Sequence, residues 1–254
     1  MKHIPDVLWS EIEKLIPHKT SMVGRPEFDN RKTLNGIFFV LKTGIQWKEL
    51  PEKYGAPTTI HSKFMKWCRM GIFEKILKKA REYYRKRNSK NMWYAFDTTL
   101  KKAPFAKFGG KNPTDRSKIG VKHTLLVDRK GAPLFVGIAP ANRHDSKLLK
   151  SSLKPMRKSK NVRIIAADSA FDAKELRSFC KEKNIVLLAA TNSRRKINCH
   201  KYRPCCRWIV ERTLGWFSWY RGLKICWAKT YISHLAFLQL AASIQLFKMG
   251  GIFG

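Results

Sequence analysis

The chain has 254 residues, of which 52 are Lys or Arg and 18 are Asp or Glu, so its formal net charge is +34 at pH 7. Hydrophobic residues make up 44% of the sequence, which excludes a disordered basic tail, because such a tail lacks the apolar surface that a core buries. A positive charge of this size repels itself when the chain compacts and is typical of a protein whose partner is a polyanion, above all a nucleic acid.

Two other classes of protein fit the composition less well. Ribosomal proteins are as basic but are usually shorter and poorer in tryptophan, whereas this chain has 8 Trp and 15 Phe. No stretch approaches the roughly 20 apolar residues that span a bilayer, and the most apolar one, residues 235–247, suits a buried helix. The first residues carry no signal-peptide pattern. We therefore expect no membrane association and a location in the cytoplasm, on the nucleoid.

Residues 1–88 are expected to form a small, all-helical domain. Apolar residues at helical spacing predict helices at four places: residues 6–16, 31–42, about 58–69 and 72–87. The third of these helices carries Lys63, Lys66 and Arg69 on one side and an apolar stripe on another. We interpret the arrangement as helix-turn-helix-like, with this helix contacting DNA; a helical domain with a solvated basic face is the alternative.

Residues 89–254 are expected to form an α/β catalytic domain. Apolar runs bounded by turn residues predict five strands: residues 92–97, 121–127, 133–139, 162–167 and 185–190. Helices are predicted from residue 145 and over residues 173–183, 206–219 and 233–249. Three antiparallel strands followed by two parallel ones with crossover helices form a mixed five-stranded sheet in the ribonuclease H-like order. Periodicity alone supports only a mixed α/β domain.

Three carboxylates stand out in a chain with few acidic residues. Asp97 and Asp168 each follow an apolar strand, so both are expected at the rim of the sheet, and Glu211 lies on the helix predicted over residues 206–219. If the first and fourth strands are neighbours, the two aspartates face each other and the helix can bring Glu211 within reach. Converging carboxylates repel one another unless a divalent cation binds between them, and Mg²⁺ or Mn²⁺ prefers such oxygen ligands. Two such ions stabilise the attacking and leaving oxygens of a phosphoryl transfer.

Each of these acids also has a plain structural reading. Asp97 and Asp168 can cap strand ends, and Glu211 can pair with Arg207 one helical turn away. Asp145 is expected to cap the helix that it begins, and Asp172 either supports the metal site or caps the following helix. Lys122 and His123 lie on a strand beside Asp97, where one of them is expected to contact a phosphate, with a surface position at the sheet edge as the alternative.

Several short motifs, in their order and spacing along nearly the whole chain, resemble DDE-type transposases of bacterial insertion sequences, in the group named after insertion sequence five. The amino-terminal motifs are Gly24-Arg25-Pro26, Leu41-Lys42-Thr43-Gly44-Ile45-Gln46-Trp47 and Phe64-Met65-Lys66-Trp67. The catalytic motifs are Phe96-Asp97, Gly120-Val121-Lys122-His123, Asn142-Arg143-His144-Asp145-Ser146, Ala167-Asp168-Ser169-Ala170-Phe171-Asp172 and Arg207-Trp208-Ile209-Val210-Glu211-Arg212-Thr213.

The resemblance implies that Asp97, Asp168 and Glu211 are the catalytic, metal-binding triad. Related transposases carry a Tyr, Arg, Glu, Lys signature around the glutamate. Arg207 and Glu211 fit it, but Pro204 and Ser218 occupy the tyrosine and lysine positions. Arg207, Arg212 and Arg221 are candidates for contacts with DNA phosphates, with a solvated arginine as the alternative.

The sequence thus predicts a transposase that binds the terminal inverted repeats of its element, cleaves DNA and transfers the strand to target DNA with Mg²⁺ or Mn²⁺. Because two ends must be brought together, we expect a homo-oligomer in the synaptic complex. The alternatives are a ribonuclease H-like nuclease that cleaves without joining and a DNA-binding protein that has lost its activity.

Overall fold

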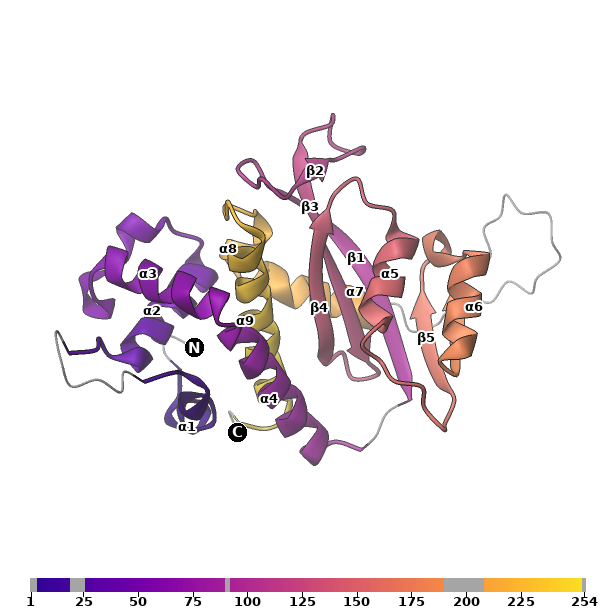
Figure 1. Cartoon of the computed structure of the whole chain (residues 1–254), viewed down its shortest axis with the longest axis horizontal. Coiled ribbons are helices and arrows are strands. Elements are labelled where there is room, and N and C mark those ends of the chain that lie inside the picture. Colours follow the sequence, from indigo (N-terminus) through magenta and orange to yellow (C-terminus); the bar gives the residue numbers. More distant parts are fainter. Residues whose placement is uncertain (1–3, 19–25, 90–91, 190–207, 253–254) are drawn as a thin grey trace. The chain divides into compact units, whose positions relative to one another are not determined.

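The computed structural model of the chain describes residues 4–18, 26–89, 92–189 and 208–252 (Figure 1). It divides into two compact units. The helical unit comprises Met1–Asn88 and Ser218–Gly254, and the sheet unit comprises Ser89–Phe217. The first division coincides with the boundary expected near residue 88. The expected catalytic domain, residues 89–254, differs from the sheet unit, because the last helix packs with the amino-terminal helices.

The helical unit is built from six α-helices in its described part. They are α1 (Asp6–Ile12), α2 (Asn30–Thr43), α3 (Pro57–Arg69), α4 (Ile72–Arg87), α8 (Arg221–Lys224) and α9 (Tyr231–Met249). Short 3₁₀ helices cover Glu13–Leu15, Trp47–Glu49 and Glu52–Tyr54. The predicted helices are all present, although the first becomes a 3₁₀ turn after Ile12. Among the described residues, none of the helices has the length and apolar character needed to cross a membrane.

Helix α9 explains why the carboxyl-terminal residues join the helical unit. It is buried around most of its circumference, so it needs apolar partners on several sides. Phe237 stacks on Phe64 of α3 with ring centroids 4.8 Å apart and on Trp47 at 6.1 Å. Phe247 contacts Tyr83 of α4 at 5.3 Å. These aromatic contacts make α9 part of the helical core.

The connections between the helices determine how the expected DNA-binding motif is built. Asp29 caps α2 by accepting hydrogen bonds from the amides of Arg31 and Lys32, and Gly44, with φ of 70°, ends that helix. The connection from α2 to α3 spans residues 44–56 and is longer than the 3–4-residue turn typical of a DNA-binding helix-turn-helix. Only Met70 and Gly71 join α3 to α4, and Gly71 has φ of 65°.

The sheet unit contains a six-stranded mixed sheet. Its strands are β1 (Trp93–Lys102), β2 (Gly110–Lys111), β3 (Ile119–Asp128), β4 (Pro133–Pro140), β5 (Arg163–Ala167) and β6 (Ile185–Ala189). β3 pairs antiparallel with β1, β2 and β4, whereas β1, β5 and β6 run parallel to one another. The five long strands therefore lie in the order β4, β3, β1, β5, β6, which is the predicted ribonuclease H-like order.

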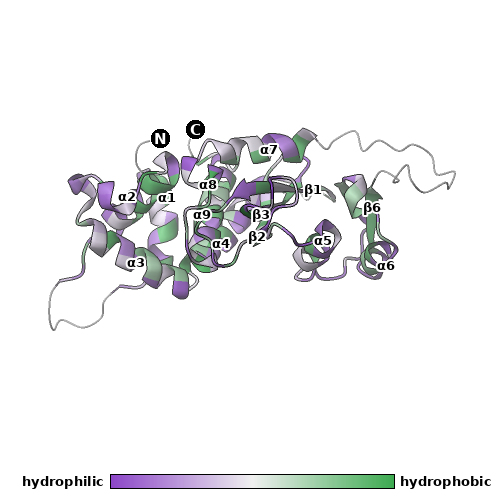
Figure 2. Ribbon diagram, turned by 90° about the horizontal axis from the view of Figure 1, so that it is seen from above, coloured by the Kyte–Doolittle hydropathy of each residue, from purple (hydrophilic) through white to green (hydrophobic). Residues whose placement is uncertain are grey.

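Helices cover both faces of this sheet. Figure 2 shows α7 (Trp208–Ser218) on one side and α5 (Asp145–Leu153) and α6 (Lys174–Glu182) on the other. Phe96 of β1 points toward α5 and α6, where it packs edge-on against Phe171 at 5.2 Å in the main core. Because side chains alternate along a strand, Asp97 points to the opposite face, the one that α7 covers.

Two features of the sheet were not expected from the sequence. β1 continues five residues beyond the predicted end at Asp97, because its partner β3 is equally long and pairs with it up to Lys102 opposite Gly120. The short β2 adds a sixth strand beside β3. The apolar pattern that predicts strands stops at Asp97, and the remainder of β1 is polar except for Leu100.

Candidate active site at the sheet edge

Asp97 and Asp168 reach the same level of the sheet from neighbouring parallel strands. The register pairs Ala95 of β1 with Ala166 of β5, so each aspartate stands two residues beyond that pair. β5 ends at Ala167, which places Asp168 at its carboxyl end. Asp97 lies within β1 rather than at its end, but it also lies just beyond the part of β1 that pairs with β5. The two aspartates therefore share an edge of the sheet, as predicted, because β5 ends beside Asp97 while β1 continues.

Backbone amides fix the orientation of both carboxylates. Oδ1 of Asp97 accepts a hydrogen bond of 2.7 Å from the amide of Thr98, and Oδ1 of Asp168 accepts one of 2.6 Å from the amide of Ser169. Both side chains are half-buried at the end of fully buried segments. These hydrogen bonds restrict the rotamers of both side chains. Carboxylate oxygens are the ligands that a hard divalent cation prefers, so these two residues could hold such an ion.

Glu211 stands apart from this pair. It lies on an exposed position of α7, because Ile209, Val210 and Thr213 occupy the buried side of the helix. Within the described part of the chain, no three His, Cys, Asp or Glu side chains are grouped closely enough to hold a metal ion. The structure thus brings the two aspartates to one edge but does not gather the three predicted acids into one cluster.

Helix α7 is attached to the turn between β3 and β4. The hydroxyl of Thr213 donates a buried hydrogen bond of 2.8 Å to the carbonyl of Gly131, and Nη2 of Arg212 donates one of 2.8 Å to the carbonyl of Lys130. The Arg212 guanidinium also lies 4.8 Å from the ring of Trp208 and 4.9 Å from that of Trp216. Arg212, a predicted phosphate contact, therefore serves to hold α7. Arg207 lies outside the described residues.

Lys122 and Asp145 form an ion pair next to Thr98, on the face of the sheet opposite to that of Asp97. Nζ of Lys122 lies 2.8 Å from Oδ1 of Asp145 and also donates 2.9 Å to the carbonyl of Arg143. The same Asp145 oxygen accepts a hydrogen bond of 3.1 Å from the hydroxyl of Thr98. The Lys122 side chain is only 11% exposed and its ammonium is bonded within the protein, so its predicted phosphate contact, which stays a prediction, means breaking these bonds.

The expectations for neighbouring residues are corrected by the structure. The side chain of His144, and not that of Asp145, caps α5 by accepting from the amide of Ser146. His123 is 2% exposed and lies opposite Thr99, on the Asp97 face of the sheet. It is therefore an interior residue rather than a surface contact. Asp172 pairs with Nε of Arg177 at 2.7 Å, while Ala173 occupies the cap position of α6.

In the helical unit, Lys63 is also held internally. Its Nζ donates to the carbonyl of Phe28 at 2.6 Å and pairs with Glu27 at 3.1 Å. A DNA contact at Lys63 stays a prediction, and forming it means breaking these bonds. Lys66 and Arg69 remain exposed on α3, as does Arg221 on α8, as predicted for phosphate contacts.

The described cysteines offer no reactive thiolate. Cys68, Cys180 and Cys226 are buried and reduced. Burial raises the pKa of the Cys68 and Cys226 thiols to about 12 and that of Cys180 to about 11. A nucleophilic thiol needs a lowered pKa, so these three residues are structural.

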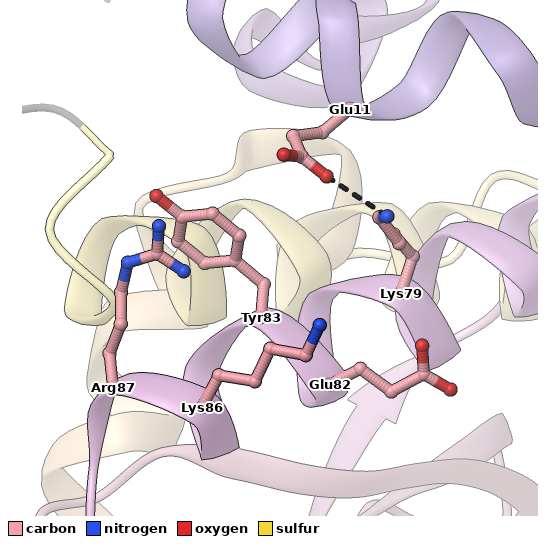
Figure 3. A pocket seen from close by; sticks show the side chains of 6 residues that line it. All are labelled: Glu11, Lys79, Glu82, Tyr83, Lys86 and Arg87. Atoms are coloured by element: carbon pink, nitrogen blue, oxygen red, sulfur yellow. Dashed lines mark ion pairs between the residues drawn. The ribbon is translucent and has the colours of Figure 1, made fainter.

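A pocket of about 250 Å³ lies between α1 and α4 in the helical unit (Figure 3). Lys79 pairs with Glu11 across it at 3.1 Å, and the Arg87 guanidinium lies 3.6 Å from the centre of the Tyr83 ring. Three of the charged groups that line the pocket, Glu11, Lys79 and Arg87, therefore already have partners in the protein. We assign no ligand to this pocket.

Two family models match the chain. The model "Putative transposase of IS4/5 family (DUF4096)" matches residues 4–77, and the model "Transposase DDE domain" matches residues 88–246. The second match spans the sheet unit and most of α9, so it includes the edge with Asp97 and Asp168.

Curated relatives come from the same class of mobile elements. A protein described as "Putative transposase for insertion sequence element IS402" from Burkholderia cepacia is 31% identical over 53% of this chain and 66% of its own length. The "Insertion element IS402 uncharacterized 16.2 kDa protein" from the same organism is 35% identical over 29% of this chain and 54% of its own length. The chain thus spans less than two thirds of the length of either relative.

Among solved structures, the piggyBac transposase synaptic complex with hairpin DNA aligns with 98% of this chain and 73% of its own chain. The TM-score is 0.47 and the identity 12%, so this likeness adds nothing to the family match.

Proposed function

The chain belongs to the transposase DDE domain family, and from this premise we propose that it binds the terminal inverted repeats of an insertion element, cleaves the DNA and transfers the strand to target DNA. The observation that carries the proposal is the register of β1 and β5, which sets Asp97 and Asp168 level at one sheet edge. The positive charge supports DNA as the partner, because cations that neutralise phosphates release the counterions bound to DNA.

We infer that Asp97 and Asp168 hold Mg²⁺ or Mn²⁺ together with Glu211. The donor set fits a hard divalent ion, since both aspartates offer carboxylate oxygens whose orientation is fixed by the amides of Thr98 and Ser169. When bound, two such ions supply charge stabilisation for the attacking water or 3′-hydroxyl and for the leaving 3′-oxygen. Glu211 joins the pair only if α7 presents it to the edge when DNA is bound, so its role is part of the proposal.

The residues around the pair act by positioning. Thr98 donates its amide to Asp97 and its hydroxyl to Asp145, which in turn pairs with Lys122. This chain of contacts ties the Asp97 segment of β1 to both β3 and α5. We propose that it keeps the Asp97 carboxylate in place against the repulsion of Asp168 before a metal ion binds.

Joining two transposon ends requires that two active sites meet, so we propose a homo-oligomer in the synaptic complex. The chain is proposed to act in the bacterial cytoplasm on nucleoid DNA.

The test is an assay of a labelled element end with Mg²⁺. We expect cleavage at the end of the element and joining of the labelled 3′ end to a target plasmid. Cleavage without joining would instead identify a nuclease, and end binding with neither reaction would identify a DNA-binding protein that lacks activity. Either outcome contradicts the proposed transposase.

A further inference from the structure

Residues 102–119, which we call the basic finger, connect β1 to β3 beyond the carboxylate edge. β1 runs without interruption from Asp97 into the finger at Lys102, a distance of about 17 Å at the rise of an extended strand. Figure 1 shows the loops on either side of β2 projecting beyond the other strands of the sheet. The finger therefore extends from the end of the sheet at which Asp97 lies, in the direction in which β1 continues.

The finger concentrates exposed positive charge. It carries five cationic residues and one acidic residue, Asp115. All five cations are exposed: Lys102, Lys107, Lys111, Arg116 and Lys118. Unlike Lys63 and Lys122, none of the five pairs with a carboxylate among the described residues. Their charges are therefore available to an external anion.

The finger also has a defined internal structure. Oδ1 of Asn112, which is 6% exposed, accepts from the amide and the hydroxyl of Thr114 at 3.1 and 2.9 Å. The backbone closes on itself through hydrogen bonds from Asn112 to Lys118 at 2.8 Å and from Lys118 to Asp115 at 2.9 Å. These contacts fix the turn that displays Arg116 and Lys118, so their charges are presented without the full entropic cost of ordering a loop.

The turn adopts an unfavourable backbone conformation to do so. Arg116 and Ser117 have φ of 48° and 58°, a left-handed conformation that costs energy in residues other than glycine. At the base of the finger, Gly110 packs so tightly that a β-carbon there would overlap the side chain of Asn142. Glycine at this position lets the finger lie directly against the loop after β4.

From these observations we infer that the basic finger is a docking surface for the sugar-phosphate backbone of duplex DNA that extends from the carboxylate edge. The inference rests on the proposed function, which makes DNA the substrate at that edge. A duplex whose reacting phosphate lies at Asp97 passes the finger within one helical turn, about 34 Å. Five unpaired cations spaced along an ordered loop suit consecutive phosphates rather than one small anion.

The test measures the affinity of the full chain for a duplex of arbitrary sequence at several salt concentrations, without divalent metal. The variant K107A/K111A/R116A/K118A is expected to bind at least tenfold more weakly and to reduce the salt slope of binding by about 3–4, since each phosphate contact contributes about 0.9. The matched control K154A/K158A/K160A/K174A removes the same charge from exposed positions around α5 and α6. It is expected to change the salt slope by less than about 0.9, the contribution of one phosphate contact.

Single variants test the same inference in case the quadruple variant fails to fold. Lys107→Ala and Lys111→Ala, with unchanged circular dichroism, are each expected to lower the slope by about 0.9. Equal losses of DNA affinity and salt slope in both quadruple variants would show that DNA binding depends on net charge alone, which overturns the finger as a specific docking surface. A variant that changes the sedimentation coefficient of the free protein but not the salt slope would assign the finger to contact between copies, which also overturns the inference.

The two proposals can fail separately. If the finger variants change the salt slope but the chain neither cleaves nor joins a labelled end, the docking surface stands and the transposase activity fails. If the chain joins ends and the finger variants bind as tightly as the control, the activity stands and the docking surface fails.

Discussion

The carboxylate edge of β1 and β5 and the exposed face of α7 hold the predicted acids in different ways. Asp97 and Asp168 are positioned by strand register, which the hydrogen bonds of the whole sheet maintain. Glu211 is positioned by how α7 docks, with Ile209, Val210 and Phe217 buried and with hydrogen bonds from Arg212 and Thr213 to the turn between β3 and β4. The comparison teaches that strand register alone brings the two aspartates to one edge, whereas the position of Glu211 depends on the docking of a helix.

The largest effect is expected for the two aspartates at the sheet edge, Asp97 and Asp168. Asp97→Asn and Asp168→Asn should each lower DNA cleavage by more than about 100-fold, because loss of a group that merely supports a metal ligand already costs 10–100-fold. DNA binding measured by fluorescence anisotropy should remain nearly unchanged. Glu175→Gln, an exposed acid on α6, is the control and should leave cleavage intact. Retained cleavage in either asparagine variant would remove that residue from the proposed site.

The next prediction tests whether Glu211 joins the pair in the working complex. Glu211→Gln is expected to lower cleavage nearly as much as Asp97→Asn and to raise the Mg²⁺ concentration needed for half-maximal rate, because the third oxygen ligand is weakened. The rate is measured over a series of Mg²⁺ concentrations, with Glu182→Gln as the control. A loss below about tenfold would show that Glu211 is not the third ligand and that it does not join the two aspartates even when DNA is bound.

Breaking the Lys122–Asp145 ion pair should loosen the pairing of β1 with β3 near Asp97. Lys122→Met leaves Asp145 partly buried without its cation, so we expect the free energy of unfolding to fall by about 1–3 kcal/mol, less than for a fully buried pair because Asp145 is partly exposed. Hydrogen exchange of the β1 and β3 amides measures the change. Lys147→Met, at an exposed position of α5, should stay within about 0.5 kcal/mol. Equal protection in the two variants would show that the pair does not stabilise the edge.

The last prediction concerns α7 and tests its hydrogen bond to the turn between β3 and β4. Gly131 has φ of 88°, and a β-carbon there would lie 2.9 Å from the Thr213 hydroxyl. Gly131→Ala should therefore destabilise α7 by about 1–3 kcal/mol. Gly215→Ala meets no atom within 4 Å and should stabilise the same helix by about 0.5–1 kcal/mol. Hydrogen exchange of the α7 amides should move in opposite directions in the two variants. A shift in the same direction would contradict the proposed anchor.

The sequence predicts the strand-borne part of the site well because local pattern and topology agree there. Apolar runs that end in Asp97 and Asp168 mark buried strands, and the ribonuclease H-like order makes the two strands neighbours. The predicted end of β1 was wrong, because its polar second half is held by pairing with β3 rather than by burial. Pairing between distant segments leaves no periodic signal in a single strand.

The charged side chains were harder to predict for a physical reason. Lys63 and Lys122 read as surface cations, yet each finds oxygen acceptors far away in the sequence, at Phe28 and Asp145 respectively. Spacing along one helix or strand cannot reveal such partners. The helical partners of α9 were missed for the same reason, since its apolar stretch predicts burial without saying against which unit.

The return of α9 to the amino-terminal helices also bears on the order of folding during synthesis. The sheet unit is complete once residue 217 has left the ribosome, whereas the surface of α3 around Phe64 stays uncovered until Phe237 has been made. We expect the nascent chain to acquire its protease-resistant sheet first and its helical unit last, although that unit contains the earliest residues. Limited proteolysis of chains stalled before α9 should therefore cut within residues 26–88 and spare β1 to β6, and resistance of both regions would contradict this order.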